Sequence, residues 1–384
     1  MKILQVIPFF SPKFGGSVTV LYDLSKELAK RKHDVTIITT DFGFDPQYAD
    51  TIRTDGVTVI SFKAILNFGL FIYTPSMKSW LRDNIKDFDV IHMHNFRSYQ
   101  NNIVYRYAMQ NHIPYIVQPQ GTVLPFFEKQ ALKRIYDICW GKQILKNASN
   151  LFASSKNESD QIQSMGVERN KITIVPTCLD LSEFNNLPQR GTFKAKYGIK
   201  PNEKVILFLG RIHKIKGIDL LIDAFFDLSN EMDDIKLVII GPDGGLMDSL
   251  LKKVEDLNIR EKIIFTGMIH NFDKFAAYVD AEIYVLPSKS EAFGLTVLEA
   301  WACGTPVIIS EGCLISEFLP NKEIIFKRDK NQLKNLLKKI FQDNGLKTKL
   351  QNEGKELLKN QFNWSKGIEN YIFIYSDLIK KRAL

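Results

Sequence analysis

The sequence is poor in cysteine, and the few cysteines are widely spaced. They are Cys139, Cys178, Cys303 and Cys313, and no two of them are two or three residues apart. That spacing argues against a cysteine-ligated zinc site. So few cysteines in a chain of 384 residues also argue against a disulfide framework. We therefore expect reduced thiols and a cytoplasmic protein.

The sequence also lacks a long apolar run. A helix needs roughly 18–20 apolar residues to cross a bilayer. The longest candidate, Ala64–Tyr73, is interrupted by Asn67 and Gly69. The N-terminal stretch MKILQVIPFF lacks the basic cluster and the small-residue cleavage site of a signal peptide. We predict a buried first strand there.

Charges of the two signs are close to balanced and therefore exclude little. Lys and Arg total 51 against 43 Asp and Glu, which gives a formal net charge of +8. This excess would suit phosphate-bearing small molecules, anionic lipid or nucleic acid, and charge alone does not choose among them. Hydrophobic residues make up 45% of the chain, which argues against a disordered or fibrous protein, and the length favours two domains.

Short apolar runs alternate with helical patterns along the whole chain. Most runs are continuous, as in strands that are buried on both faces of a parallel sheet. The alternation occurs twice, so we predict an α/β protein with two doubly wound domains, residues 1–185 and 195–364. A last helix at about 365–384 is expected to pack back on the first domain. The strands are expected at Lys2–Ile7, Val35–Thr39, Val57–Ser61, Val90–His92, Tyr115–Val117, Leu151–Ser154, Ile172–Val175, Val205–Leu209, Leu237–Ile240, Ile263–Thr266, Ile283–Leu286, Val307–Ile309 and Glu323–Phe326.

The most informative stretch is PSKSEAFGLTVLEAWACGTPV, which runs from Pro287 to Val307. Glu291 precedes the point where a strand gives way to a helix, and Glu299 lies eight residues later, inside that helix. Both carboxylates can therefore face one crevice, beside the amides of residues 293–296 at the helix N-terminus. That arrangement suits a ligand with both hydroxyl groups and phosphate. The alternative is that Glu291 is only a charge at the helix start and that Glu299 is a surface residue.

A basic loop, GRIHKIKG, follows the expected strand Val205–Leu209. Ligands of open α/β sheets bind at the carboxyl ends of strands, so Arg211 and Lys216 project where a diphosphate could sit. A guanidinium binds phosphate oxygens in a two-pronged way, and an ammonium acts as a point charge. We expect this pair to stabilise a departing diphosphate without a metal. The alternative is an ordinary basic loop, which is how we interpret Lys214.

The first half of the chain offers weaker signals. Gly15 and Gly16 precede a helix, where paired glycines allow either close approach of a ligand or merely a tight turn. His92 and His94 lie at the end of a strand. We expect their imidazoles on opposite faces, which makes them a poor metal pair and leaves His94 either to reach a cleft or to be a core histidine. The D-x-D pattern Asp87–Asp89 lies at the amino end of that strand, on the wrong side for ligands.

Taken in order, these stretches resemble the family 4 glycosyltransferases. The segments that carry the resemblance are FGGS, DVIHMH, PQGTVLPF, LFASSKNES, ITIVPTCLD, GRIHKIKG, IIGPDGG and PSKSEAFGLTVLEAWACGTPVI. Each segment is weakly specific, but their order and spacing over nearly the whole chain are strongly specific. The resemblance implies the GT-B fold, in which two Rossmann-like domains face each other across a cleft, and sugar transfer with retention at the anomeric carbon.

The resemblance also implies roles for individual residues. Arg211 and Lys216 look like the pair that holds the donor diphosphate. Glu291 matches the glutamate that contacts the donor sugar, and Glu299 the one that binds the ribose hydroxyls. His94 matches a histidine near the reacting carbon and, with Glu291, Lys216 and Arg211, completes the expected catalytic set. Further donor contacts are expected at Gly15, Gly16, Met268, Phe293, Gly294, Leu295 and Thr296.

Two positions depart from the family pattern. Gln120 stands where members often have histidine, so the acceptor role of that loop need not carry over. Thr177 and Cys178 replace a usual Asn-Gly pair, which we expect to alter only a turn.

The implied reaction moves a sugar from a UDP- or GDP-sugar to a saccharide or lipid-linked saccharide, in the assembly of bacterial surface polysaccharide such as O-antigen or capsule. No metal and no cofactor are expected, and the leaving phosphate would take the acceptor proton because no conventional base is evident. The alternatives are a nucleotide-sugar-binding protein without turnover, a sugar-nucleotide epimerase, a phosphorylase and a nucleic-acid binder. The last two lack support, since neither a pyridoxal-lysine site nor an aromatic-basic motif is recognisable.

One helical segment, Phe126–Leu145, mixes aromatic side chains with Lys129, Lys133, Arg134 and Lys142. This pattern is typical of a helix on an anionic leaflet and equally of a helix packed on its own domain. The first interpretation predicts peripheral contact with the inner face of the plasma membrane.

Overall fold

The structure is a computed structural model that describes residues 1–68, 71–124, 129–269 and 271–383. The chain forms two compact units. Unit 1 comprises Met1–Cys178 and Trp364–Leu384, and unit 2 comprises Leu179–Asn363. Within the described ranges, no helix combines the length and the apolar character that a membrane span requires.

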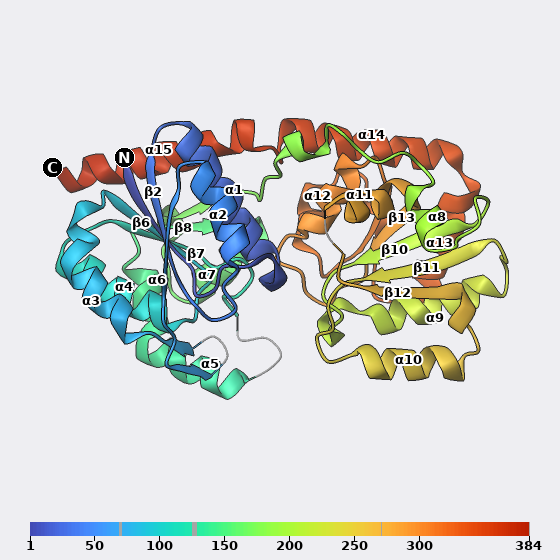
Figure 1. Cartoon of the computed structure of the whole chain (residues 1–384), viewed down its shortest axis with the longest axis horizontal. Helices are drawn as coiled ribbons and strands as arrows, with labels where there is room; N and C mark the ends of the chain where they lie inside the picture. The colour runs from blue at the N-terminus through green and yellow to red at the C-terminus, as the bar shows by residue number, and fades with distance from the viewer. Residues whose placement is uncertain (69–70, 125–128, 270, 384) are drawn as a thin grey trace. The chain divides into compact units, whose positions relative to one another are not determined.

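Unit 1 is built on a parallel sheet of seven strands, ordered β3-β2-β1-β6-β7-β8-β9 (Figure 1). The order reverses between β1 and β6, as in doubly wound folds. Alternate side chains of β1 enter two separate hydrophobic clusters, with Leu4 and Val6 in one and Ile3 in the other. Both faces of the sheet are therefore buried, which explains the continuous apolar runs. The strands are β1 Lys2–Val6, β2 Asp34–Thr40, β3 Thr58–Phe62, β6 Val90–His94, β7 Tyr115–Gln118, β8 Asn150–Ala153 and β9 Ile172–Ile174.

The helices of unit 1 connect its strands, and the last helix of the chain joins them. Helix α15, Trp364–Ala383, packs its aromatic side chains on this sheet: the rings of Tyr371 and Phe152 lie 5.0 Å apart, and the Tyr375 hydroxyl lies 2.7 Å from His92 Nδ1. The other helices are α1 Gly16–Lys30, α2 Pro46–Thr54, α3 Pro75–Asn84, α4 Tyr99–Gln110, α5 Gln130–Tyr136, α6 Lys142–Lys146 and α7 Lys156–Ser164.

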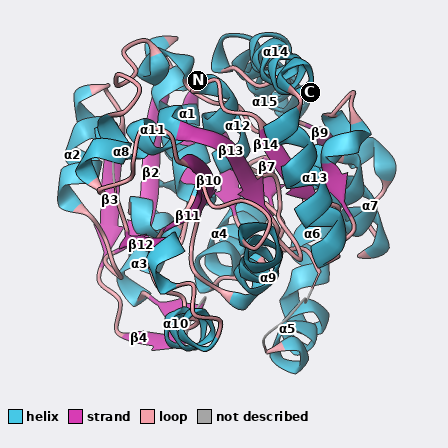
Figure 2. Ribbon diagram, turned by 90° about the vertical axis from the view of Figure 1, so that its right-hand side faces the viewer, coloured by secondary structure: helices cyan, strands magenta, loops and turns pink. Residues whose placement is uncertain are grey.

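A short antiparallel hairpin, which the sequence pattern did not predict, projects from unit 1 between β3 and α3. Its strands are β4, Leu66–Phe68, and β5, Phe71–Tyr73. Gly69 and Leu70 lie outside the described residues. In Figure 2 the hairpin and α5 are both drawn at the lower end of the molecule.

Unit 2 contains a parallel sheet of six strands, ordered β12-β11-β10-β13-β14-β15. Its order reverses between β10 and β13, which pair in parallel with Ile206 opposite Ile283. Figure 1 shows α9 and α10 along one side of this sheet and α11 and α12 along the other. The strands are β10 Lys204–Leu209, β11 Ile235–Ile240, β12 Ile263–Gly267, β13 Ala281–Leu286, β14 Val307–Ser310 and β15 Ile325–Phe326. The helices are α8 Thr192–Lys196, α9 Ile218–Ser229, α10 Met247–Asp256, α11 Asn271–Asp280, α12 Leu295–Ala302, α13 Lys330–Gln342 and α14 Asn344–Asn360.

The two doubly wound sheets confirm the predicted α/β class, and nearly all expected strands are present within one or two residues. The exception is the stretch from Glu323 to Phe326. Its first part forms a 3-10 turn, Lys322–Ile324, and only Ile325–Phe326 pairs with β14. The expected helix Phe126–Leu145 is present from Gln130 as α5, a π-helical turn Asp137–Gly141, and α6, while Phe126–Glu128 lie outside the described residues.

A buried ion pair fastens this helical segment to the loops at the carboxyl edge of the unit 1 sheet. Arg97 donates two hydrogen bonds to Asp137, from Nε to Oδ1 at 2.8 Å and from Nη2 to Oδ2 at 2.7 Å. The same guanidinium donates to the carbonyl oxygens of Thr122 and Val123 in the loop after β7. Both charged side chains are about 6–7% exposed, so each depends on the other for compensation.

We expect Arg97→Met to lower the free energy of unfolding of unit 1 by about 3–5 kcal/mol, because it leaves the buried carboxylate of Asp137 unpaired. Denaturant unfolding followed by fluorescence measures this loss. Arg82→Met is the matched control, since it removes an exposed pair with Asp83 and should hardly move the unfolding midpoint. Equal losses in the two variants would contradict the prediction.

Candidate active site

Two loops meet at the point where the strand order of unit 2 reverses. The loop of residues 210–217 follows β10, and the loop of residues 287–294 follows β13, the neighbouring strand. Ligands of doubly wound sheets bind at the carboxyl ends of the strands beside such a reversal. The two motifs that the sequence pattern singled out therefore share the expected ligand edge of the sheet.

Backbone contacts hold these two loops together. The amide of Lys289 donates to the carbonyl oxygen of Ile215 at 2.7 Å, which joins the two loops directly. From outside both loops, the side chain of Arg328 donates through Nη1 to the Pro287 carbonyl oxygen at 2.9 Å. Gly217 adopts a left-handed φ of 69°, and a Cβ atom there would lie 2.2 Å from the Pro287 oxygen. Only glycine fits at this crossing, so the last residue of GRIHKIKG is fixed by packing against the second loop.

The charged side chains of the two loops also pair. Lys216 Nζ donates to Glu291 Oε2, and the two side chains are 18% and 17% exposed. The backbone of Glu291 is held on both sides, because its amide donates to the Gly312 oxygen at 2.9 Å and its carbonyl accepts from the Leu314 amide at 3.2 Å. The side chain of Arg211, at the start of the first loop, is exposed. The carboxylate of Glu291 and the cationic residues Lys216 and Arg211 thus lie on the two loops at this edge.

Helix α12 begins at the same edge. Gly294 caps it with a φ of 91°, and Leu295 is its first residue. The side chain of Phe293 is buried against Phe318 and Phe362, so its backbone rather than its ring is the part that can meet a ligand. Thr296 Oγ1 lies 2.6 Å from the hydroxyl of Tyr284. The amides of residues 293–296 make this helix N-terminus suited to an anion.

Glu299, on α12, is held through both carboxylate oxygens. Lys274 Nζ donates to Oε1 at 2.9 Å, and the Tyr278 hydroxyl donates to Oε2 at 3.0 Å. Burial alone would lower the pKa of Lys274, but the charge and hydrogen bond of Glu299 outweigh it and raise that pKa. Each carboxylate oxygen has two lone pairs, so two acceptor positions remain in a fixed orientation.

The two glutamates act on one buried hydroxyl. Burial raises the pKa of Tyr284 well above its ordinary value, and the charges of Glu291 and Glu299 both add to that rise. Tyr284 lies on β13, beneath the start of α12. Both carboxylates therefore act electrostatically on the same buried side chain. Both glutamates are paired and mostly buried, so neither is a freely exposed surface carboxylate.

Lys274 and Tyr278 are site residues that sequence reasoning missed. They lie four residues apart on α11, so their side chains share one face of that helix. The spacing was visible in the sequence, but nothing there indicated that this face meets α12. Only the packing of the two helices against β13 reveals their partner.

Three of the predicted residues, Gly15, Gly16 and His94, lie in unit 1, at the end of or after the two strands between which the order of its sheet reverses. Gly15 has a φ of 85° and caps α1, which starts at Gly16. The Gly15 amide already donates to the Pro12 oxygen at 3.0 Å, so that amide serves a turn. Of the two glycines, Gly16 is therefore the better candidate for a ligand contact through its amide.

The histidines of β6 correct one expectation. The imidazoles of His92 and His94 lie on the same face, with ring centroids 4.1 Å apart, because residues i and i+2 of a strand point the same way. His94 has no exposed surface and so does not reach an open cleft in this structure. Burial lowers its pKa to about 3, so its ring is neutral at physiological pH.

A polar loop covers His94. The Gln120 amide nitrogen lies 3.5 Å from His94 Nδ1, and the Gln5 side-chain oxygen lies 2.8 Å from Nε2. Gln120 has a left-handed φ of 53°, and the next residue, Gly121, donates its amide to the buried carboxylate of Glu158 at 2.5 Å. Glu158 thus holds the loop of residues 119–121 in place. Burial raises the pKa of Glu158, although hydrogen bonds from Ser154 and Gly121 act to lower it.

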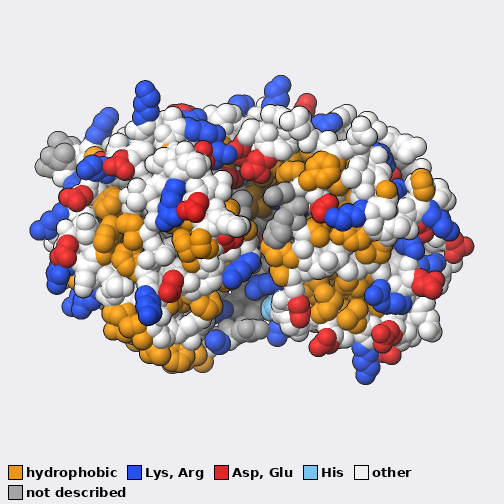
Figure 3. Space-filling model, in the orientation of Figure 1, with side chains coloured by type: hydrophobic (Ala, Val, Ile, Leu, Met, Phe, Trp, Pro, Cys, Tyr) orange, Lys and Arg blue, Asp and Glu red, His pale blue; other side chains and the backbone are white. Residues whose placement is uncertain are grey.

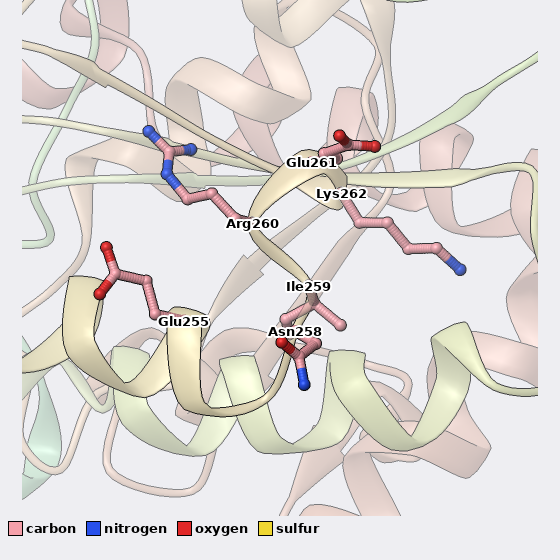
Figure 4. A pocket seen from close by; sticks show the side chains of 6 residues that line it. All are labelled: Glu255, Asn258, Ile259, Arg260, Glu261 and Lys262. Carbon is pink, nitrogen blue, oxygen red and sulfur yellow. The ribbon is translucent and has the colours of Figure 1, made fainter.

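Met268 follows β12 and is 39% exposed, at the carboxyl edge of the unit 2 sheet. A shallow pocket of about 460 Å³ lies elsewhere, between the end of α10 and the start of β12 (Figure 4). That is the amino end of the strand, where doubly wound sheets do not bind their ligands. We assign no function to this pocket, which is lined by Glu255, Asn258, Ile259, Arg260, Glu261 and Lys262.

Comparison with known proteins identifies the family. Residues 14–183 match the family model "Glycosyltransferase Family 4", and residues 189–357 match the model "Glycosyl transferases group 1". The chain belongs to the family 4 glycosyltransferases. It is therefore an enzyme of the glycosyl-transferring class (EC 2.4), as the resemblance implied.

This glycosyltransferase has relatives along most of its length. It is 24% identical over 397 residues to an uncharacterized glycosyltransferase of Methanocaldococcus jannaschii, with 98% of each chain covered. It is 27% identical over 344 residues to alpha-monoglucosyldiacylglycerol synthase of Streptococcus pneumoniae, covering 84% of this chain and 74% of the relative. Its fold matches HepE of Anabaena, solved in complex with UDP and glucose, with a TM-score of 0.82 at 16% identity, covering 98% of this chain and all of HepE. That likeness supports the GT-B fold.

The crossing of the loop of residues 210–217 with the loop of residues 287–294 gives a test in this glycosyltransferase. We expect Gly217→Ala to destabilise unit 2 by about 1–2 kcal/mol for the left-handed backbone and by about 1–3 kcal/mol more for the clash with Pro287. Gly198→Ala is the matched control, because Gly198 has a similar φ of 65° and open space around its would-be Cβ. Thermal unfolding compares the two. If both variants lose the same stability, the prediction that Gly217 has no room for a Cβ atom beside Pro287 is wrong.

Proposed function

We propose that this glycosyltransferase moves a sugar from a nucleotide-diphosphate donor, a UDP- or GDP-sugar, to a saccharide or lipid-linked saccharide, with retention at the anomeric carbon. The observation that carries the proposal is the Lys216–Glu291 pair at the strand-order reversal of unit 2, beside the N-terminus of α12. Such an edge offers positive charge for a diphosphate and carboxylates for hydroxyl groups. HepE, which shares the fold, was solved with UDP and glucose.

In the proposed reaction the donor breaks its anomeric carbon–phosphate oxygen bond, and an acceptor oxygen forms a bond to the same carbon. Arg211, Lys216 and the amides of residues 293–296 stabilise the charge that develops on the leaving diphosphate. Glu291 orients the donor sugar, and the leaving phosphate takes the acceptor proton on the face where attack occurs. No metal ion and no cofactor takes part, so a chelator is expected to leave the rate unchanged.

The other predicted residues have supporting roles in this proposal. Glu299 binds the ribose hydroxyls, the backbone at Met268 meets the nucleobase, and the Gly16 amide contacts the bound donor. His94 lies near the reacting carbon as a neutral hydrogen-bonding group, once Gln120 no longer covers it.

The acceptor belongs to the proposal as well. The related synthase from Streptococcus pneumoniae bears the name of a diacylglycerol glycolipid, which favours a lipid-linked acceptor here. We propose that the chain works in the cytoplasm, at the inner face of the plasma membrane, in assembly of a bacterial cell-surface polysaccharide.

Lys216→Ala tests the donor edge. We expect kcat/KM for sugar transfer to fall about 100- to 1000-fold, because a charge that stabilises the leaving group is lost. Thermal unfolding should show that the variant still folds. Lys214→Ala is the control, since Lys214 is an exposed lysine of the same loop and should keep full activity. Survival of transfer and donor hydrolysis in Lys216→Ala would show that the site is misassigned.

The same assay separates the alternatives. A nucleotide-sugar-binding protein would bind UDP or GDP without transferring sugar to any acceptor, and an epimerase would change the donor sugar without an acceptor. A product of inverted configuration by NMR, or loss of activity in chelator, would overturn the retaining, metal-independent mechanism.

Lys274→Met tests whether the hydrogen bond from Lys274 positions the Glu299 carboxylate for the ribose. We expect the variant to bind UDP about tenfold more weakly and to discriminate less against 2′-deoxy-UDP, because the carboxylate that accepts from the ribose loses a charged hydrogen bond. Titration calorimetry measures both ligands, and Lys274→Arg should restore part of the difference. Lys253→Met is the control, since Lys253 is a half-buried lysine paired with Asp223 on neighbouring helices. An unchanged preference for ribose in Lys274→Met would exclude this role.

A further inference from the structure

Two elements of unit 1 expose large hydrophobic side chains together. On the β4–β5 hairpin these are Ile65, Leu66, Phe68, Phe71 and Tyr73, with exposures from 36% to 68%. On α5 and the π-helical turn after it they are Leu132, Ile135, Ile138 and Trp140, with exposures from 49% to 73%. So many large apolar side chains exposed on two elements of one unit indicate a candidate interaction site.

Both elements rest on the first turn of α4, so they belong to one surface. The ring of Tyr99 lies 5.5 Å from that of Phe71 and 5.1 Å from that of Tyr73. One turn along α4, the Tyr136 hydroxyl lies 2.5 Å from Asn102 Oδ1. Figures 1 and 2 draw the hairpin and α5 at the same end of unit 1, and in Figure 3 hydrophobic side chains gather there with Lys and Arg beside them.

The charges within this surface are almost all positive. Residues 129–142 contain four Lys or Arg and one acid, Asp137, which is buried against Arg97. The described hairpin residues 63–68 and 71–74 add Lys63 and no acid. The carboxylate of Asp41 accepts from the Ala64 amide at 2.7 Å, at the base of the hairpin. The basic side chains of residues 129–142 are Lys129, Lys133, Arg134 and Lys142.

This chemistry fits a lipid leaflet better than a protein. Lysine is depleted in the cores of protein interfaces, whereas aromatic and aliphatic side chains flanked by Lys and Arg are typical of elements that lie at a membrane surface. Trp and Tyr favour the headgroup level, where Trp140 and Tyr73 could sit. Stable peripheral binding needs two signals, and this surface has both apolar insertion and positive charge.

We propose that the hairpin and the α5 segment together dock unit 1 on an anionic lipid leaflet. The proposal deepens the proposed function and rests on the part of it that places the enzyme at a membrane. It also places the leaflet near the loops after β6 and β7, where we propose that the acceptor binds. Arg97, in the loop after β6, donates two hydrogen bonds to Asp137, which follows α5, and one to the Val123 carbonyl oxygen in the loop after β7. A lipid-linked acceptor held in that leaflet would approach the edge where Gln120 and His94 lie.

Vesicle flotation of the full chain tests the surface. We expect binding to phosphatidylcholine vesicles that contain phosphatidylglycerol, and little binding to phosphatidylcholine alone. Raising the salt to about 1 M, where the Debye length falls to about 3 Å, should release the protein. Lys129→Gln with Arg134→Gln should weaken partitioning about fivefold per charge. Phe68→Ser with Ile138→Ser should weaken it at least as much, because both insertion points lose their apolar side chain.

Matched variants on other surfaces serve as controls. Phe373→Ser changes a side chain that is 70% exposed on α15, and Lys252→Gln with Lys355→Gln removes two exposed charges of unit 2. Neither control should change flotation. Affinity for UDP should be the same in all variants, so that failure of docking is distinguishable from failure of the donor site.

Three outcomes would overturn the proposal. The first is absence of binding to anionic vesicles by the wild-type chain. The second is equal weakening by the surface variants and their controls. The third is a wild-type dimer by light scattering that Phe68→Ser with Ile138→Ser converts to a monomer, since a second copy would then cover this surface.

Discussion

The pairing of Lys216 with Glu291 is the contact on which the carboxyl edge of the unit 2 sheet depends. It joins loops that follow two neighbouring strands, at the one place in the unit 2 sheet where the strand order reverses. Each side chain is mostly buried, so each charge needs either the other or a ligand. In the proposed reaction a diphosphate takes over the lysine and frees the glutamate for the sugar. Donor binding then exchanges one set of ionic partners for another without leaving a charge unpaired.

Most of the fold, and the place where the two charged loops meet, could be predicted from the sequence for a physical reason. A strand buried on both faces must be apolar throughout, so β10 and β13 are visible as continuous runs. The chemistry of a doubly wound sheet lies directly after its strands, so GRIHKIKG and PSKSEAFG could be placed at one edge before any contact was known. Gly217 shows how closely local sequence and packing agree there, since the space between its Cα atom and the Pro287 carbonyl oxygen is too small for a methyl group.

The features that could not be predicted from the sequence depend on which helix and strand faces pack against each other. Lys274 and Tyr278 reach Glu299 only because α11 packs beside α12, and the sequence spacing gives no partner for them. The hairpin was missed because its strands are three residues each and exposed, which produces no buried run. The prediction that His92 and His94 lie on opposite faces of the strand was wrong, because residues two apart in a strand point to the same face. Their burial could not be predicted either, since it depends on contacts with Tyr375 and Gln120 from distant parts of the chain.

Helix α15 has a consequence for how the chain is made. Tyr371 and Tyr375 cover Phe152 and His92 in the unit 1 sheet, yet they are synthesised after the whole of unit 2. Unit 1 therefore cannot close its core on the ribosome when its own strands have emerged, and it waits with an open apolar face until the last twenty residues follow. A chain shortened at its C-terminus would lose part of its first unit rather than its second, and the order of domain completion would be the reverse of the order of translation.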